Sequence, residues 1–363
     1  MFAALCLLAS ADTAAAQSPD QVRGWKAEWD KTVAAAKKEG RLVIVMSSSE
    51  GRRDFLLTRW KRDFPEIALS ATVMRGASLL PGWVAERRAG RYLWDVFHSG
   101  AISGVATMRA GLLDPLLPEL ILPEVKDPEI WGGWDDAFYD NQRKYLLALV
   151  SDLQSPYYNA GMLAPEKLKA LGLKVLLEPS LKGKSTWFDP RIEGPGASFM
   201  VLLAHVLGEE RLRRFMVDQD PVFVATLREA AEALVRGKAA VAFAGNLAHD
   251  LQPYIEAGIK IDARPFGNGP DTAFRGTGGA TLGVFNKRPH PNAARVFVNW
   301  IMTKRIAAAM AQATGFDSRR ADVVSLDPES AAIPGVRYIE AQREDQQVVA
   351  RKWMAELRRL RPQ

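Results

Sequence analysis

Small polar residues stand where predicted strands end and helices begin, and their backbone and side-chain donors could bind an anion. Helix N-termini leave N–H groups unpaired and carry a partial positive charge, so phosphate and carboxylate groups bind there. Serine and glycine also cap helices without any ligand, but five such turns in one chain favour a binding site. The candidate contacts in these turns are Ser47, Ser48, Ser49, Gly76, Ser78, His98, Ser99, Gly196, Ser198 and Asn246.

Arginine, tyrosine and threonine side chains complete the candidate set. Arg191 and Arg275 suit an anionic group, although each could equally form a surface or interlobe ion pair. His98 could likewise cap the end of its strand instead of contacting a ligand. The remaining candidates are Tyr157, Tyr158 and Thr277.

The sequence carries no complete signature of a metal site or an enzyme. None of the four histidines has a second His or a Cys at the spacing of a zinc site. Residues 183–185 end like a phosphate-binding loop, but Glu178 stands where its first glycine belongs. Residues 276–279 fail the dinucleotide fingerprint at Thr281, and no serine lies in a G-x-S-x-G turn. We therefore predict no enzyme, no catalytic residue, no metal and no cofactor.

Strands and helices alternate along the chain to position these turns. Continuous apolar runs predict buried strands, and apolar residues at helical spacing predict the segments between them. This alternation predicts an α/β fold with mostly parallel sheets flanked by helices. Strands are expected at 42–46, 69–74, 94–98, 145–150, 185–188, 239–243 and 280–285. Helices are expected around Trp25 to Glu39 and Phe55 to Trp60, and at 79–90, 198–216, 224–236, 292–313 and 344–360.

The composition is that of a soluble globular protein. Of 363 residues, 48% are hydrophobic and 25% are charged, which predicts about two domains at roughly 150 residues each. A single cysteine excludes a disulfide scaffold. The net charge of +6 argues only weakly for an anionic partner. The basic segment 344–360 has no interleaved surface aromatics for base stacking, so we predict no nucleic-acid partner.

The first 16 residues resemble an export signal. An apolar run from Phe2 to Ala9 is too short to span a bilayer, and Ala14-Ala15-Ala16 ends in a small-x-small cleavage pattern. No Lys or Arg follows Met1, so the true start could lie elsewhere. We predict cleavage near Ala16 and a soluble periplasmic protein.

Several segments of the chain share motifs with one family. They are 34–45, 94–97 with 110–113, 156–159 and 189–196, and the most specific runs from Gly278 to Trp300. Together they resemble the bacterial extracellular solute-binding proteins of ABC transporters, in particular the branch of the ferric-binding proteins. The resemblance extends from Trp25 to Val324.

This resemblance implies a two-lobed periplasmic-binding-protein fold of type II. Residues 17–148 would form the first part of lobe 1, residues 149–280 lobe 2, and residues 281–363 the returning part of lobe 1. Crossing segments would lie at 145–153 and 277–285. The lobes would close by a hinge on a ligand and present it to an inner-membrane permease, with the protein acting as a monomer.

The ligand expected from the resemblance is a small anionic or polar organic solute. In ferric-binding relatives, two adjacent tyrosines that ligate iron follow the strand that corresponds to 239–243. Leu247 and Ala248 stand at those positions here, and Fe³⁺ needs anionic oxygen ligands. Ferric-ion binding remains an alternative. A ligand-sensing subunit of a membrane histidine kinase is another, because the sequence does not separate sensing from transport.

Overall fold

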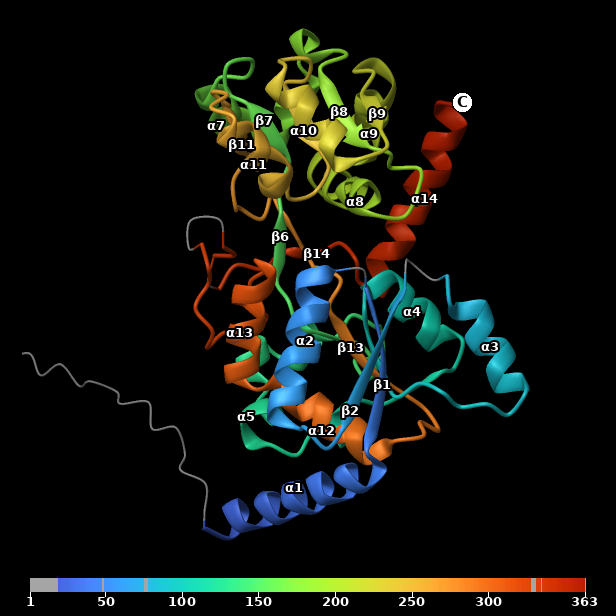
Figure 1. The fold of residues 1–363 in the computed structure, drawn as a ribbon. Helices are drawn as coiled ribbons and strands as arrows, with labels where there is room; N and C mark the ends of the chain where they lie inside the picture. The colour runs from blue at the N-terminus through green and yellow to red at the C-terminus, as the bar shows by residue number, and fades with distance from the viewer. Residues whose placement is uncertain (1–18, 48, 75–77, 328–330, 334, 363) are drawn as a thin grey trace, which may run out of the picture.

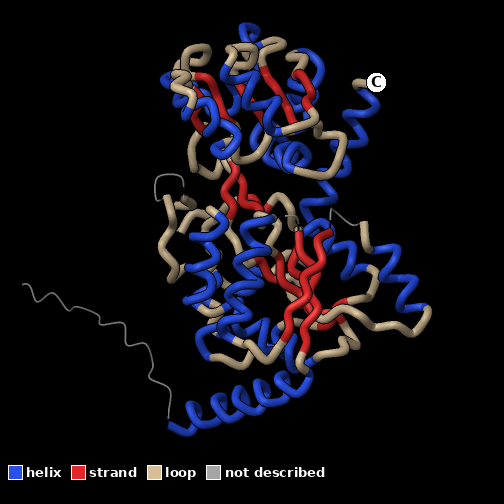
Figure 2. The backbone as a smooth tube through the Cα atoms, viewed as in Figure 1, coloured by secondary structure: helices blue, strands red, loops and turns tan. Residues whose placement is uncertain are grey.

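The computed structural model describes residues 19–47, 49–74, 78–327, 331–333 and 335–362 (Figure 1). The predicted signal peptide at 1–16 lies outside the described residues, as do Ser48 and Gly76. The described chain forms a lower and an upper half, each with its own sheet, and a short third sheet between them (Figure 2). No helix in these ranges combines the length and the apolar character that crossing a bilayer requires.

The lower half is built on a six-stranded sheet in the order β2-β1-β3-β13-β4, with β5 also paired to β13. β1 runs parallel to β2 and β3, and β13 runs antiparallel to β3, β4 and β5. Leu42, Ile44 and Val45 of β1 have no exposed surface, as expected of a strand covered on both faces. The strands are β1 (Arg41–Ser47), β2 (Ala68–Met74), β3 (Val96–Ser99), β4 (Leu113–Asp114), β5 (Leu147–Ala148) and β13 (Thr281–Phe285).

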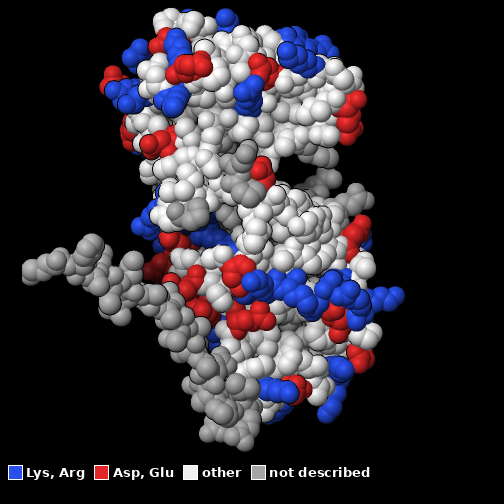
Figure 3. All heavy atoms as spheres, turned by 90° about the vertical axis from the view of Figure 1, so that its left-hand side faces the viewer, with Lys and Arg blue, Asp and Glu red and all other residues white. Residues whose placement is uncertain are grey.

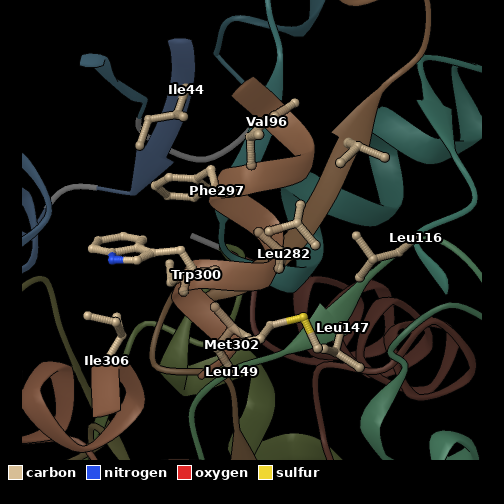
Figure 4. Close-up of a cluster of buried hydrophobic side chains, with 14 of the residues drawn as sticks. Ile44, Val96, Leu116, Leu147, Leu149, Leu282, Phe297, Trp300, Met302 and Ile306 are labelled. Atoms are coloured by element: carbon tan, nitrogen blue, oxygen red, sulfur yellow. The ribbon is translucent and has the colours of Figure 1, made fainter. Parts of the chain in front are cut away.

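Helices cover this sheet, and the buried core lies between them and the strands (Figure 4). α12 contacts both α1 and β1, and its Trp300 ring meets the Trp60 ring edge-on at 5.2 Å. Burying a large apolar side chain stabilises a fold by about 1.5–3 kcal/mol. The helices of the lower half are α1 (Pro19–Glu39), α2 (Glu50–Asp63), α3 (Leu80–Arg88), α4 (Ala101–Arg109), η1 (Leu117–Glu119), α5 (Pro123–Lys126), η2 (Glu129–Trp131), α6 (Trp134–Ala137), α12 (Pro291–Met302) and α13 (Lys304–Thr314).

The upper half holds a five-stranded sheet in the order β11-β7-β10-β8-β9. β8 runs parallel to β10 and β9, and β7 runs antiparallel to β10 and β11. The strands are β7 (Tyr157–Asn159), β8 (Ser185–Phe188), β9 (Val222–Val224), β10 (Val241–Phe243) and β11 (Ala263–Pro265). The helices are α7 (Pro165–Leu171), η3 (Gly172–Leu177), η4 (Pro179–Leu181), α8 (Pro195–Leu207), α9 (Glu209–Asp218), α10 (Leu227–Val235) and α11 (Ala248–Glu256).

Three short strands connect the two halves: β6 (Asp152–Gln154), β12 (Phe274–Gly276) and β14 (Ile339–Glu340). β12 lies between the others, antiparallel to β6 and parallel to β14. The crossing segment expected at 145–153 overlaps this sheet only at its end, and the one expected at 277–285 begins just after β12, because β5 and β13 pair inside the lower sheet. The chain therefore crosses at 152–154 and 274–276, and a third strand from near the C-terminus joins there.

The predicted α/β fold with sheets flanked by helices is confirmed, and three details differ. Each sheet mixes parallel with antiparallel pairs. The helix expected over 198–216 divides at Gly208, whose positive φ of 78° ends α8. The helix expected over 292–313 divides at Thr303, because its side chain caps a new helix by accepting from the backbone N–H of Ile306.

The last helix, α14 (Glu344–Leu360), follows the predicted bounds of 344–360 and packs against α8 of the upper half (Figure 1). Trp353 and Leu357 are almost fully buried in the same hydrophobic cluster as Phe199 and Phe215. We predicted 281–363 as the returning part of the lower lobe. The main hydrophobic contacts of α14 are instead with the core of the upper half.

Candidate ligand-binding site

The carboxyl end of β1 and the start of α2 lie on the side of the lower half that faces the upper half (Figure 1). The Ser47 hydroxyl donates to the Gly279 carbonyl oxygen at 2.8 Å. The Ser49 hydroxyl accepts from the backbone N–H of Arg52 at 3.4 Å and so caps α2. The turn that holds Ser47 and Ser49 therefore borders the space between the halves. Ser78, in the turn before α3, is exposed.

Arg52 is a buried cation in the first turn of α2, and the sequence analysis missed it. Its Nη1 donates to the Ser47 hydroxyl at 2.9 Å and to the Gly279 carbonyl at 3.1 Å, and its Nη2 donates to the Gly278 carbonyl at 2.7 Å. Burial lowers the pKa of Arg52 to about 10, against the favourable effect of Asp152. The guanidinium ties β1 and α2 to the loop before β13.

His98 and Ser99 end β3 next to this arginine. The His98 side chain is fully buried, and neither ring nitrogen has a hydrogen-bond partner within the described part of the chain. Burial, and then the charge of Arg52, lower the pKa of His98 to about 3. The Ser99 carbonyl oxygen accepts a hydrogen bond from the Thr281 hydroxyl at 2.6 Å. His98 is therefore a neutral imidazole at neutral pH.

In the upper half, the first turn of α8 meets the carboxyl ends of β8 and β10. A Cβ on Gly196 would lie 1.9 Å from the Phe188 carbonyl oxygen, and one on Gly245 would lie 3.4 Å from the Pro195 Cβ. Only glycine fits at position 196, because the backbone of β8 occupies the space of a side chain. Ser198 is buried and donates to the Gly194 carbonyl at 3.3 Å, so its hydroxyl is used within the helix.

Tyr157 and Asn246 lie together where β7 begins and β10 ends, inside the upper sheet. The Tyr157 hydroxyl donates to the Asn246 side-chain oxygen at 3.1 Å, and this oxygen also accepts from the backbone N–H of Ala248. Burial raises the pKa of Tyr157 to about 12. Tyr158 points to the other face of β7, where its ring packs edge-on against Phe266 at 5.5 Å. Of the two predicted tyrosines, Tyr157 lines the site and Tyr158 belongs to the core.

A pocket of about 520 Å³ joins the two halves at this point. The surface is notched between the lower and the upper half in a space-filling view (Figure 3). Tyr157 and Asn246 line the pocket from the upper half, and Phe316 lines it from the loop that follows α13. Asp152 of the connecting strand β6 lies between them.

Three other predicted residues take part in structural contacts. Arg191 forms a two-pronged pair with Asp189 at 2.8 and 2.9 Å. Arg275 lies 3.3 Å from Glu340, on the strand next to its own. Thr277 is fully buried and hydrogen-bonded to the Gln342 side chain. The ion-pair alternative for the two arginines therefore describes the contacts that they make.

Arg52, Asp152 and Gln154 were missed, and only the first gives a usable signal in the sequence. The helix dipole disfavours a cation in the first turn of a helix, so an arginine three residues after a capping serine is unexpected for stability alone. Asp152 and Gln154 read as ordinary loop residues, because the pairing of β6 with β12 joins segments more than a hundred residues apart.

Residues 84–336 match the sequence model of the bacterial extracellular solute-binding proteins. The chain belongs to this family. No curated protein sequence matches it. The predicted resemblance is therefore confirmed at the level of the family, whose members bind solutes outside the cytoplasm and work with ABC transporter permeases.

Solved structures similar to this solute-binding protein share its fold at low sequence identity. Iron-bound HitA from Pseudomonas aeruginosa matches with a TM-score of 0.66 and 16% identity, over 87% of this chain and 99% of HitA. AfuA from Actinobacillus pleuropneumoniae with fructose-6-phosphate gives 0.57 and 17%, over 88% and 99%. AgtB from A. tumefaciens R10 with agropinic acid gives 0.56 and 14%, over 88% and 98%.

The described residues contain no group of three or more His, Cys, Asp or Glu side chains that could hold a metal ion. Leu247 is fully buried in a hydrophobic cluster, and Ala248 begins α11 beside the pocket. Neither position offers a metal ligand.

Proposed function

We propose that this protein binds a small polar organic solute with an anionic group between its two halves and delivers it to the permease of an ABC importer. The observation that carries the proposal is the buried guanidinium of Arg52. Its described hydrogen bonds all go to neutral hydroxyl and carbonyl oxygens. Asp152 compensates this charge only from a distance, without an ion pair in the described ranges. A buried charge that is only partly compensated is costly, so an anionic ligand near the start of α2 would lower the energy of the closed protein.

The helix N-termini at the site support the same ligand class. α2 begins beside Ser47, and α8 begins where Pro195 meets Gly245. Both helices exceed ten residues, and their N-terminal N–H groups and dipoles favour an anion. Binding between the two termini would draw the halves together.

The connecting sheet supports a hinge mechanism. Its strands have two or three residues each, and the hydrophobic clusters of the two halves are separate. Short connections between rigid bodies permit hinge closure around a ligand. In this proposal residues 17–148 and 281–363 form one lobe and residues 149–280 the other, with α14 reaching across to the second.

The cellular location and the oligomeric state are proposed from the family and from the sequence. We propose a periplasmic monomer, exported by a signal peptide that is cleaved near Ala16. The neighbours AfuA and AgtB were solved with fructose-6-phosphate and agropinic acid, which are organic solutes with acidic groups. Iron in HitA does not lead us to propose iron here, because Leu247 and Ala248 supply no ligand.

Thermal unfolding of residues 17–363 with a panel of solutes tests the proposal. The panel sets phosphonates, carboxylates and sugar phosphates against neutral sugars, polyamines and ferric citrate. A ligand at 100 times its dissociation constant adds about 2.7 kcal/mol to the free energy of unfolding. We expect a higher melting temperature with one class of organic anion, and a smaller radius of gyration by X-ray scattering with the same solute.

Two arginines of α2 provide a matched pair of variants. Arg52→Gln removes the buried charge, whereas Arg53→Gln removes an exposed charge from the adjacent position. We expect the first to weaken anion binding and the second to preserve it. A melting shift with ferric citrate alone, or anion binding that survives in Arg52→Gln, would contradict the proposal.

A further inference from the structure

Two buried side chains on β6, Asp152 and Gln154, have fewer hydrogen-bond donors around them than their oxygen atoms could accept. The Gln154 side-chain oxygen is buried and has no hydrogen-bond partner among the residues that the structure describes. Within the same residues the Asp152 carboxylate accepts one side-chain hydrogen bond, from the Gln154 amide to Oδ2 at 2.6 Å. Only 7% of Asp152 and 8% of Gln154 is exposed. Buried acceptors are normally satisfied, so these two groups call for a donor from outside the chain.

Within the described residues the donors near β6 make no hydrogen bond to Asp152 beyond that of Gln154, and the buried Nε of Arg52 is itself unpaired. Arg52 acts on Asp152 electrostatically, but its described hydrogen bonds go to Ser47, Gly278 and Gly279, and no ion pair joins the two side chains in the described ranges. The Tyr157 hydroxyl donates to Asn246. Asp152 therefore lines the pocket, and among the described side chains only Gln154 donates a hydrogen bond to it.

The negative charge of the residues that line the pocket also favours a cationic group there. The lining residues include three aspartates, Asp152, Asp317 and Asp327, and no lysine or arginine. Asp317 is engaged by the Ser325 hydroxyl and the backbone N–H of Leu326. Burial raises the pKa of Asp152, against the opposing effects of the Gln154 hydrogen bond and the charge of Arg52.

Gly245 lies close to the side chain of Gln154. Its φ is 92°, and a Cβ at this position would lie 3.6 Å from the Gln154 side-chain oxygen. A side chain at the end of β10 would therefore contact that oxygen, which is buried and unpaired among the described residues.

We infer that the solute carries a cationic amine or guanidinium group in addition to its anionic group, and that Asp152 and Gln154 bind this cation. The inference rests on the proposed function and narrows it to zwitterionic solutes. Arg52 and the helix N-termini favour the anionic end, and β6 receives the cationic end. A charge-assisted hydrogen bond to a buried carboxylate is stronger than a neutral one, so the amine would decide specificity.

Matched solutes with and without the amine test the inference on residues 17–363. The pairs are glutamate with glutarate, glucosamine 6-phosphate with glucose 6-phosphate, and 3-aminopropylphosphonate with propylphosphonate. Each solute is used at concentrations of up to about 10 mM, so that weak binding is also detected. Thermal unfolding and titration calorimetry measure binding. We expect the amine member of one pair to bind about 10–100 times more tightly than its partner, and Asp152→Asn to remove that difference.

Control variants separate binding from folding. Asp30→Asn removes the same charge from the exposed face of α1 and should leave the preference intact. Because burial raises the pKa of Asp152, the neutral asparagine should leave the unliganded protein at least as stable at pH 7. If Asp152→Asn does not fold, Gln154→Met is the second variant. It removes the unpaired side-chain oxygen and should also reduce amine binding.

The outcomes distinguish this inference from the proposed function. Equal binding of both members in every pair that binds would overturn the inference and leave the proposed anion binding in place. Binding of polyamines without any anionic solute would uphold the cation site and overturn the anion proposal. No melting shift with any amine-bearing probe would also overturn the inference.

Discussion

The guanidinium of Arg319 lies 3.0 Å from the carboxylate of Glu340, and both side chains are buried. Glu340 also accepts from the Tyr139 hydroxyl and lies 3.3 Å from Arg275. Burial, and then the charge of Glu340, raise the pKa of Tyr139 well above its ordinary value. Since Glu340 belongs to β14 and Tyr139 to the lower half, this cluster fixes the connecting sheet to one of the two bodies that it joins.

Glu340→Gln should destabilise the protein strongly. The change leaves Arg319 as a buried cation without its carboxylate, and breaking a buried pair on one side costs about 3–5 kcal/mol. Urea unfolding followed by tryptophan fluorescence measures the loss. The control is Glu178→Gln in the exposed pair with Lys167, where a change of about 0–1 kcal/mol is expected. Equal stability of both variants would show that the buried cluster contributes nothing.

His98→Gln should flatten the loss of stability in acid. The pKa of His98 is about 3 in the folded protein against 6.5 in the unfolded chain. The unfolded chain therefore binds one more proton between these values, so stability is full above pH 6.5 and falls as the pH falls toward 3, by about 1.4 kcal/mol per pH unit. Urea midpoints at pH 7, 6, 5 and 4 for both proteins measure the slope. An unchanged slope would show that His98 is not the group that titrates.

Gly196→Ala should destabilise the upper half. The added Cβ would lie 1.9 Å from the Phe188 carbonyl oxygen, and the strand or helix must move, at about 1–3 kcal/mol for such overpacking. Gly24→Ala is the control, because it lies in α1 with no atom within 4 Å of the added Cβ. The control should gain up to about 1 kcal/mol from helix propensity. Thermal unfolding compares the two.

Tyr157→Phe should weaken solute binding, whereas Tyr158→Phe should not. Tyr157 lines the pocket and donates to Asn246, which also accepts from the backbone N–H of Ala248 at the start of α11. Losing one hydrogen bond costs about 0.5–1.5 kcal/mol, or about a threefold to tenfold loss of affinity if the solute depends on this arrangement. Calorimetry with the solute found in the panel gives the ratio. Equal losses in the two variants would place the effect in the fold and not in the pocket.

The overall fold could be predicted because buried strands read as apolar runs, and β1 and β10 are such runs. The turns that follow them were also predictable, since Ser47, Ser49 and Asn246 interrupt these runs at helix starts. Tyr157 and Tyr158 show the limit of this reading. Neighbouring residues on a strand point to opposite faces, and the sequence does not say which face of β7 is the core.

Other site residues depend on contacts that no local pattern reveals. Arg52 and Arg53 look alike in sequence, yet one is fully buried and the other is exposed. Asp152 and Gln154 gain their surroundings from β12 and Gly245, far along the chain. Gly196 was predicted as a ligand contact, but the tight approach of β8 explains the need for glycine there.

The position of α14 determines the order in which the protein can fold. Trp353 and Leu357 lie within the last eleven residues of the chain and have 1% and 0% of their surface exposed, in the core of the upper half. A nascent chain that has reached residue 340 holds every strand of that half but lacks this part of its core. The core of the upper half is therefore complete only once α14 has docked against it.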